Sequence, residues 1–86
     1  MDFMMWFDNN PKVALDDKLL QAAEYYTRKY GQKPDTAIVS GKDLGNEQAR
    51  TGGLLVEAHG VRVETMRAIM PGHMWIGVTF VDLGGA

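Results

Sequence analysis

The chain has 86 residues, a formal net charge of −2 and no cysteine, so it should form a single domain, residues 1–86, with a small core. The lack of cysteine excludes a disulfide framework, a zinc ribbon and a thiolate nucleophile, and it favours the reducing cytoplasm as the protein's location. No stretch approaches the roughly 18 apolar residues of a membrane span, so no membrane partner is expected. Nine basic residues scattered among eleven acidic ones argue against nucleic acid as a partner.

The first segment of the chain, DFMMWF, is predicted to be a strand with apolar side chains on both faces. In an extended chain Phe3, Met5 and Phe7 point one way, and Met4 and Trp6 point the other. A strand that is buried on one side only should alternate apolar and polar residues. Either this strand is internal to its sheet, or its second face meets a partner. We assign the odd-numbered side chains to the core.

Residues 13–30 form the most clearly predicted element, an amphipathic helix. Two aspartates lie in its first turn and two basic residues in its last, which complements the helix dipole at both ends. Gly31 is placed to end the helix in a left-handed conformation, and Pro34 prevents its continuation. Apolar residues recur at spacings of three and four along one side, namely Leu15, Leu19, Ala22, Ala23, Tyr26 and Tyr30.

The rest of the chain is predicted to be rich in strands. Residues 41–53 contain several glycines and few apolar residues, so we expect a flexible loop there, with at most one helical turn at NEQAR. The dipeptides His59-Gly60 and Pro71-Gly72 indicate turns. The remaining predicted strands are 36–40, 54–58, 60–66 and 73–81.

Together these elements predict an α+β fold in two layers, with one long helix packed on a mostly antiparallel sheet of four or five strands. The expected order is β-α-β-β-β-β, and the first β-α-β unit is compatible with a right-handed parallel pair. Residues 82–86 are expected to form a loose tail. The predicted core comprises Phe3, Met5, Phe7, Leu15, Leu19, Ala23, Tyr26, Ile38, Val56, Val61, Val63, Ile76, Val78 and Phe80.

Methionine and aromatic residues concentrate on or beside the first and last predicted strands. One helix covers only one face of a sheet, so the other face would expose more apolar surface than an isolated protein usually leaves in water. We therefore predict that the protein associates with itself, most simply as a two-fold homodimer, or with another protein. The predicted interaction surface is Met4, Trp6, Met70, Met74 and Trp75.

The sequence contains no recognisable catalytic constellation, and no catalytic residue or cofactor is assigned. The segment VSGKD lacks the flanking glycines of a nucleophile elbow and of a phosphate-binding loop. His59 and His73 both lie at predicted turns, so a metal-binding domain or a small metal-dependent enzyme that uses them is one alternative function, although solvated turn histidines are commoner. A nucleic-acid accessory protein is a second alternative, and its basic residues would be Lys42, Arg50, Arg62 and Arg67.

Three segments of the chain carry a resemblance to known proteins: the aromatic residues beside Asp2, the helix sequence AAEYYTRKYG, and the turn sequence MPGHMWIG. In these segments the chain resembles small uncharacterised α/β proteins of prokaryotes and their mobile elements. The resemblance covers most of the chain and implies no activity or catalytic residues. A looser likeness to the closing segment of tailed-phage major capsid proteins concerns a shorter stretch, and this chain lacks the length of that fold.

These observations lead to one functional expectation. We expect a non-catalytic, cytoplasmic protein-interaction module, such as an adaptor carried by a phage or mobile element, or an inhibitor of a host machine. The expectation depends on the surplus of apolar residues for one small sheet and on the lack of a recognisable catalytic motif.

Overall fold

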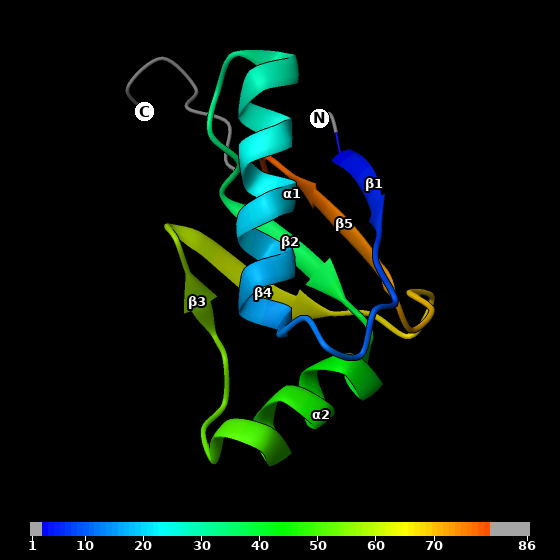
Figure 1. Ribbon diagram of the computed structural model, residues 1–86. Helices are drawn as coiled ribbons and strands as arrows, with labels where there is room; N and C mark the ends of the chain where they lie inside the picture. Colours follow the sequence, from blue (N-terminus) through cyan, green and yellow to red (C-terminus); the bar gives the residue numbers. More distant parts are fainter. Residues whose placement is uncertain (1–2, 80–86) are drawn as a thin grey trace.

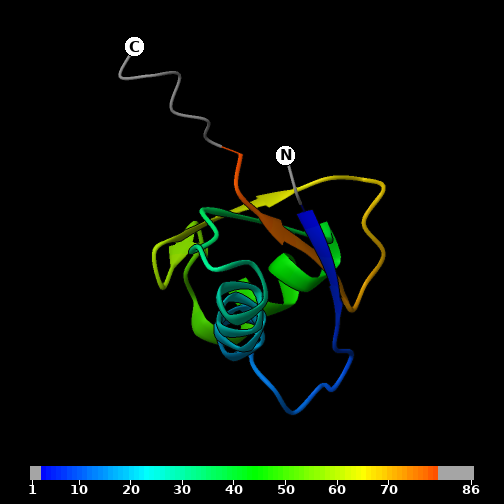
Figure 2. The same ribbon diagram turned by 90° about the horizontal axis from the view of Figure 1, so that it is seen from above.

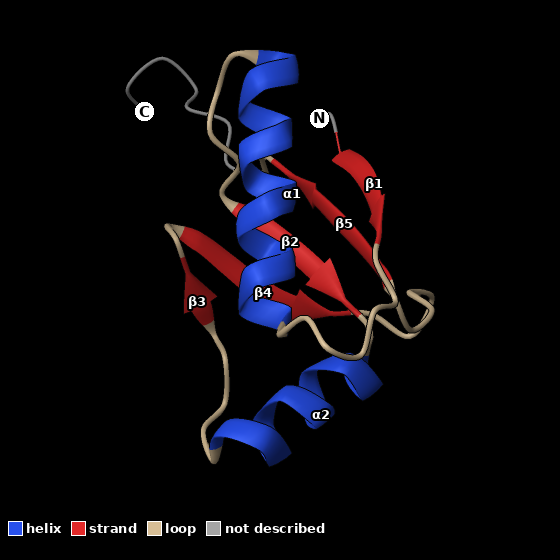
Figure 3. Cartoon of the chain, viewed as in Figure 1, coloured by secondary structure: helices blue, strands red, loops and turns tan. Residues whose placement is uncertain are grey.

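The computed structural model describes residues 3–79 as a five-stranded mixed sheet with two helices (Figures 1 and 3). The predicted α+β class is confirmed: the longer helix packs on the sheet, and three of the four strand pairs are antiparallel. The elements are β1 (Phe3–Phe7), α1 (Leu15–Tyr30), β2 (Thr36–Val39), α2 (Gly41–Thr51), β3 (Glu57–Ala58), β4 (Val61–Thr65) and β5 (His73–Gly77).

The strand order β1-β5-β2-β4-β3 places the last strand between the first two. β5 is antiparallel to both β1 and β2, so β1 and β2 run parallel but do not touch each other. The predicted β-α-β unit therefore exists with β5 inserted in its middle. The parallel pair in this sheet is β2 with β4, and the connection between these two strands contains α2 and β3.

Helix α1 follows the prediction closely. Its side facing the sheet carries the fully buried residues Leu19, Ala22 and Tyr26. Gly31 ends the helix with φ 73°, and its N–H donates to the Thr27 carbonyl. Ala14 precedes the helix and offers no capping side chain. Instead the Glu47 carboxylate of α2 accepts a hydrogen bond from the Leu15 N–H at 3.2 Å.

Residues 41–53 are not the flexible loop that their glycines suggested, because α2 occupies most of that segment. Ser40 caps this helix: its Oγ accepts a hydrogen bond from the Asp43 N–H at 3.0 Å. Gly52 closes the helix with φ 80°, and its N–H donates to the Gln48 carbonyl. The segment is helical because both of its ends have capping residues, a signal that outweighs the interior Gly45.

The predicted Pro71-Gly72 turn is confirmed, and hydrogen bonds connect it to α2 and to the residue after β1. The His73 N–H donates to the Met70 carbonyl at 3.0 Å, and Gly72 has φ 84°. The Gly72 N–H donates to the Asp43 carboxylate of α2, and its carbonyl accepts from the Asp8 N–H that follows β1. A Cβ atom at residue 72 would lie 3.1 Å from the Phe7 ring, so the close approach as well as the positive φ requires glycine.

The core lies between α1 and the sheet, but β1 enters it with the opposite face to the one predicted. Met4 lies buried at 8% exposure, whereas Met5 and Phe7 are 55% and 56% exposed. The β1–β5 register explains this, because it sets Met4 opposite the fully buried Ile76. The strand is apolar on both sides, so its sequence contains no signal for its phase.

The other predicted core residues divide into four groups. Val56 is exposed, which makes its assignment wrong, and Phe3, Ile38 and Val78 are only partly buried. Phe80 and the predicted tail lie outside the described residues. Confirmed members of the core are Leu15, Leu19, Ala23, Tyr26, Val61, Val63 and Ile76.

Candidate functional site

One face of the sheet has no helix over it in the part of the chain that the structure describes. Helix α1 lies across one face, and α2 lies beyond the end where β2 finishes (Figures 1 and 2). We call the opposite side of the sheet the open face. The alternation of side chains along each strand decides which residues reach it.

The open face is apolar along β1 and β5. The register places Met5 beside Trp75 and Trp75 beside Ile38, so one row of apolar side chains crosses three strands. Phe7 lies opposite His73 in the next row, with the two ring centroids 4.7 Å apart. Trp75 is 40% exposed although it lies in a central strand. We call Met5, Phe7 and Trp75, together with the partly buried Phe3 and Ile38, the apolar patch.

Polar residues bound the apolar patch on the side of β4. Arg62 and Glu64 point to the same face and form an ion pair, with 2.8 Å between Arg62 Nε and Glu64 Oε2. The Asp35 carboxylate accepts hydrogen bonds from the Thr36 hydroxyl at 2.8 Å and from the Thr79 N–H at 2.9 Å. The Arg62 guanidinium also donates to both threonine hydroxyls. An apolar centre with a charged margin is the usual composition of a protein-binding surface.

The five residues predicted as the interaction surface do not lie together. Met4 and Met74 are buried beneath α1 at 8% and 3% exposure, so a partner cannot reach them in this fold. Trp6 is half-buried against Tyr25 of α1, with ring centroids 5.4 Å apart. Trp75 on the open face and Met70 in the loop before β5 are exposed, so a partner can reach these two residues.

Sequence reasoning missed Met5 and Phe7 as surface residues. A signal for them existed in the last strand, whose alternation sets Met74 and Ile76 on one face and Trp75 on the other. Ile76 was correctly assigned to the core, whereas Met74 was assigned to the interaction surface and is buried. If the sequence had shown that β1 pairs with β5 in this register, Met4 would have been assigned to the core with Ile76, and Met5 to the open face with Trp75. The missing information was which strand pairs with β1.

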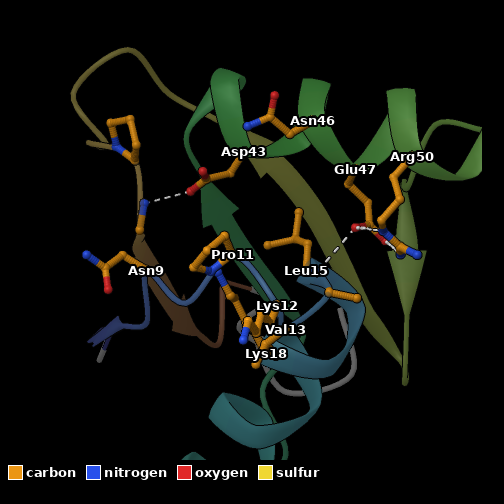
Figure 4. A pocket seen from close by; sticks show the side chains of 13 residues that line it. Asn9, Pro11, Lys12, Val13, Leu15, Lys18, Asp43, Asn46, Glu47 and Arg50 are labelled. Carbon is orange, nitrogen blue, oxygen red and sulfur yellow. Dashed lines mark hydrogen bonds and ion pairs between the residues drawn. The ribbon is translucent and has the colours of Figure 1, made fainter.

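A second candidate is a cleft of about 470 Å³ between the start of α1, α2 and the Pro71-Gly72 turn (Figure 4). Two acidic side chains of α2 reach into it, and both are engaged in structural contacts. The Asp43 carboxylate accepts from the Gly72 N–H at 2.7 Å. The buried Glu47 carboxylate accepts from the Leu15 N–H and pairs with Arg50 at 2.8 Å. The hydrogen bond that Arg50 donates to Glu47, together with the negative charge of Glu47, raises the pKa of Arg50 above its ordinary value.

The cleft joins the two helices and the turn. Lys12 and Lys18 line its mouth beside the start of α1. The carboxylates that could act on a substrate are instead hydrogen-bonded to the protein's own backbone. We therefore assign the cleft an architectural role, in which α2 caps α1 and holds the turn.

The two histidines do not form a joint site. His59 lies in the turn before β4, and its Nε2 is 2.7 Å from the Asp16 carboxylate of α1. His73 is the first residue of β5, and β5 runs in the opposite direction to β4. Each histidine lies at or just before the start of its strand, so the two histidines lie at opposite ends of the sheet. Within residues 3–79 no group of three or more metal-ligating side chains is close enough to hold an ion. The structure therefore does not support the metal site that the sequence allowed His59 and His73 to share.

The basic residues considered for nucleic-acid contacts are spread over separate elements. Arg50 pairs with Glu47 on α2, and Arg62 pairs with Glu64 on β4. Lys42 lies in the first turn of α2, and Arg67 lies in the loop after β4. Two of the four charges are thus matched by a neighbouring carboxylate, which weakens their attraction for phosphate.

Comparison with protein-family models, with curated proteins and with solved structures gave no match to this chain. The resemblance in the three sequence segments is therefore not supported by a matching family. In the part of the chain that the structure describes, no helix has the length and apolar character needed to cross a membrane.

Proposed function

We propose that this protein is a non-catalytic protein-interaction module that docks another protein on its open face. The observation that carries the proposal is the apolar patch, in which Met5, Phe7 and Trp75 expose 40% or more of their surfaces side by side. Burying such a patch against a partner stabilises a complex by roughly 25 cal/mol for each Å² of apolar surface removed from water.

The chemistry of the face favours a folded protein as the partner. Aromatic and methionine side chains are enriched in the centres of protein interfaces, while charged residues are depleted there and frequent at the rim. The apolar patch and the Arg62–Glu64 pair follow that division. A tryptophan held in a central strand is also a rigid anchor, which reduces the entropy lost on binding.

The biological setting belongs to the same proposal. A chain without cysteine is suited to the reducing cytoplasm. The sequence segments that resemble proteins of mobile elements make an adaptor, or an inhibitor of a larger host machine, the role that we propose for the module.

Site-specific photo-crosslinking in the cells that naturally produce the protein tests this proposal. A photoreactive phenylalanine analogue replaces Trp75 in one variant and Tyr30 in a control variant. Tyr30 is similarly exposed but lies at the end of α1, away from the open face. We expect residue 75 to give an adduct with a different protein, identified by mass spectrometry, and residue 30 to give none.

Three results would contradict the proposal. Residue 75 could give no adduct, both residues could give the same adducts, or residue 75 could crosslink only to a second copy of the same chain. Each of these would show that the open face does not dock another protein.

A further inference from the structure

The outer edge of β1 is a second surface of the sheet that no described residue pairs with, and it differs from the open face. Within residues 3–79, β1 is the first strand in the sheet order and pairs only with β5 on its inner side. Edge strands commonly carry a lysine, a proline or a bulge that prevents pairing with other chains. β1 has the sequence FMMWF with an unbroken register over all five residues, so it contains none of these devices.

The hydrogen-bonding pattern shows which backbone groups point outwards. The Asp8 N–H donates to the Gly72 carbonyl at 2.9 Å, which continues the β1–β5 register by one residue. In an antiparallel pair, alternate residues direct both backbone groups to the same neighbour. Even-numbered residues therefore bond to β5, and Phe3, Met5 and Phe7 direct their N–H and C=O groups to the free edge.

This arrangement is self-complementary. A second β1 strand can approach antiparallel with the two-fold axis at Met5, which places Met5 opposite the partner's Met5 and Phe3 opposite the partner's Phe7. All three pairs are then of the hydrogen-bonded type, so every outward donor meets an outward acceptor. The aromatic and methionine side chains of both copies also meet across the strands, where such pairs stabilise a sheet.

We propose that two copies of this protein join through their β1 edges into one continuous ten-stranded sheet. The opposite edge closes the assembly at two copies, because β3 has only two residues and begins with the exposed Glu57. A net charge of −2 on each copy opposes association only weakly. The inference does not depend on the open face as a docking surface, since pairing uses the backbone at the edge and leaves Trp75 accessible.

A proline substitution separates this edge from the fold itself. Met5→Pro removes a donor that points outwards, which an edge strand tolerates, and leaves the ladder to β5 complete. Each dimer loses two hydrogen bonds at its centre, so we expect the dissociation constant to rise on the order of thirtyfold or more. Trp75→Gln is the matched control, because it alters the open face and leaves the outward backbone groups of β1 unchanged.

Analytical ultracentrifugation of the purified full chain measures the outcome. At about 100 µM, a concentration suited to an interface of modest size, the wild type and Trp75→Gln should sediment as twice 9.5 kDa. Met5→Pro should sediment as a monomer with the circular dichroism of the wild type. A monomeric wild type would overturn the proposal, and so would a dimer that survives Met5→Pro or that dissociates with Trp75→Gln.

Amide hydrogen exchange of the wild type provides a test that needs no variant, in case Met5→Pro does not fold. The amides of Phe3, Met5 and Phe7 should become more protected as the protein concentration rises. Those of Met4 and Trp6 should be protected at every concentration, because they bond to β5. Exchange at the odd-numbered residues that is fast and independent of concentration would exclude edge pairing.

Discussion

Met4 and Met5 are adjacent, chemically identical and placed in opposite environments. The sequence predicts the strand that contains them but not its phase, because no polar residue interrupts FMMWF. The phase follows from a long-range contact, the pairing of β1 with β5, which sets Met4 opposite Ile76. The identity of the surface residues depends on this phase, so the prediction of the strand did not suffice to predict the site.

The phase can be tested with two alanine substitutions. Met4→Ala removes a buried side chain and should lower the free energy of unfolding by about 2–3 kcal/mol, because it leaves a cavity in the core. Met5→Ala should change it by about 0.5 kcal/mol or less, since half of that side chain already meets water. Urea unfolding of dilute protein measures both values. If both substitutions lowered the free energy of unfolding equally, or if Met5→Ala lowered it more, the assignment of the Met4 face of β1 to the core would be wrong.

At the scale of the element, the two helices show what a single sequence reveals. Helix α1 is predictable because its apolar residues keep the helical period over four turns and its ends carry matching charges. Helix α2 buries only Glu47 and contains Gly45, so its pattern is weak. Its detectable signal is local: Ser40 and Asp43 at the start and Gly52 at the end form caps.

Helix α2 also supplies the acceptor at the start of α1, where Glu47 accepts from the Leu15 N–H. The sequence does not reveal this role, because Glu47 and Leu15 are far apart in the chain. Glu47→Ala should lower the free energy of unfolding by about 1–3 kcal/mol, because the Leu15 N–H loses its acceptor inside the structure. Glu47→Gln keeps an acceptor and should cost less, although it removes the negative charge at the start of α1.

Gln48→Ala, at an exposed neighbouring residue of α2, is the control for helix propensity and should have little effect. Urea unfolding gives the three stabilities, and the exchange rate of the Leu15 amide reports the start of α1 directly. If Glu47→Ala unfolds at the same urea concentration as Gln48→Ala, the contact between the helices does not stabilise the fold.

At the scale of the whole molecule, the number of layers, the long helix and the mostly antiparallel sheet were predictable from hydrophobic periodicity. The order of the strands was not, because β5 enters between β1 and β2 from the far end of the chain. That insertion brings Met5 and Trp75 together and creates the apolar patch. It also leaves β1 at the edge of the sheet, where a second copy can pair with it.

Contact between the open face and another protein in the cell can be measured by hydroxyl-radical footprinting. The oxidation rates of Met5 and Trp75 are measured in dilute purified protein and in the cells that naturally produce it. Tyr30 and Leu54 are exposed elsewhere and serve as internal references. Relative to the two references, Met5 and Trp75 should be oxidised readily in the purified protein and protected in the cell. The same relative rates in both settings would contradict the proposed contact.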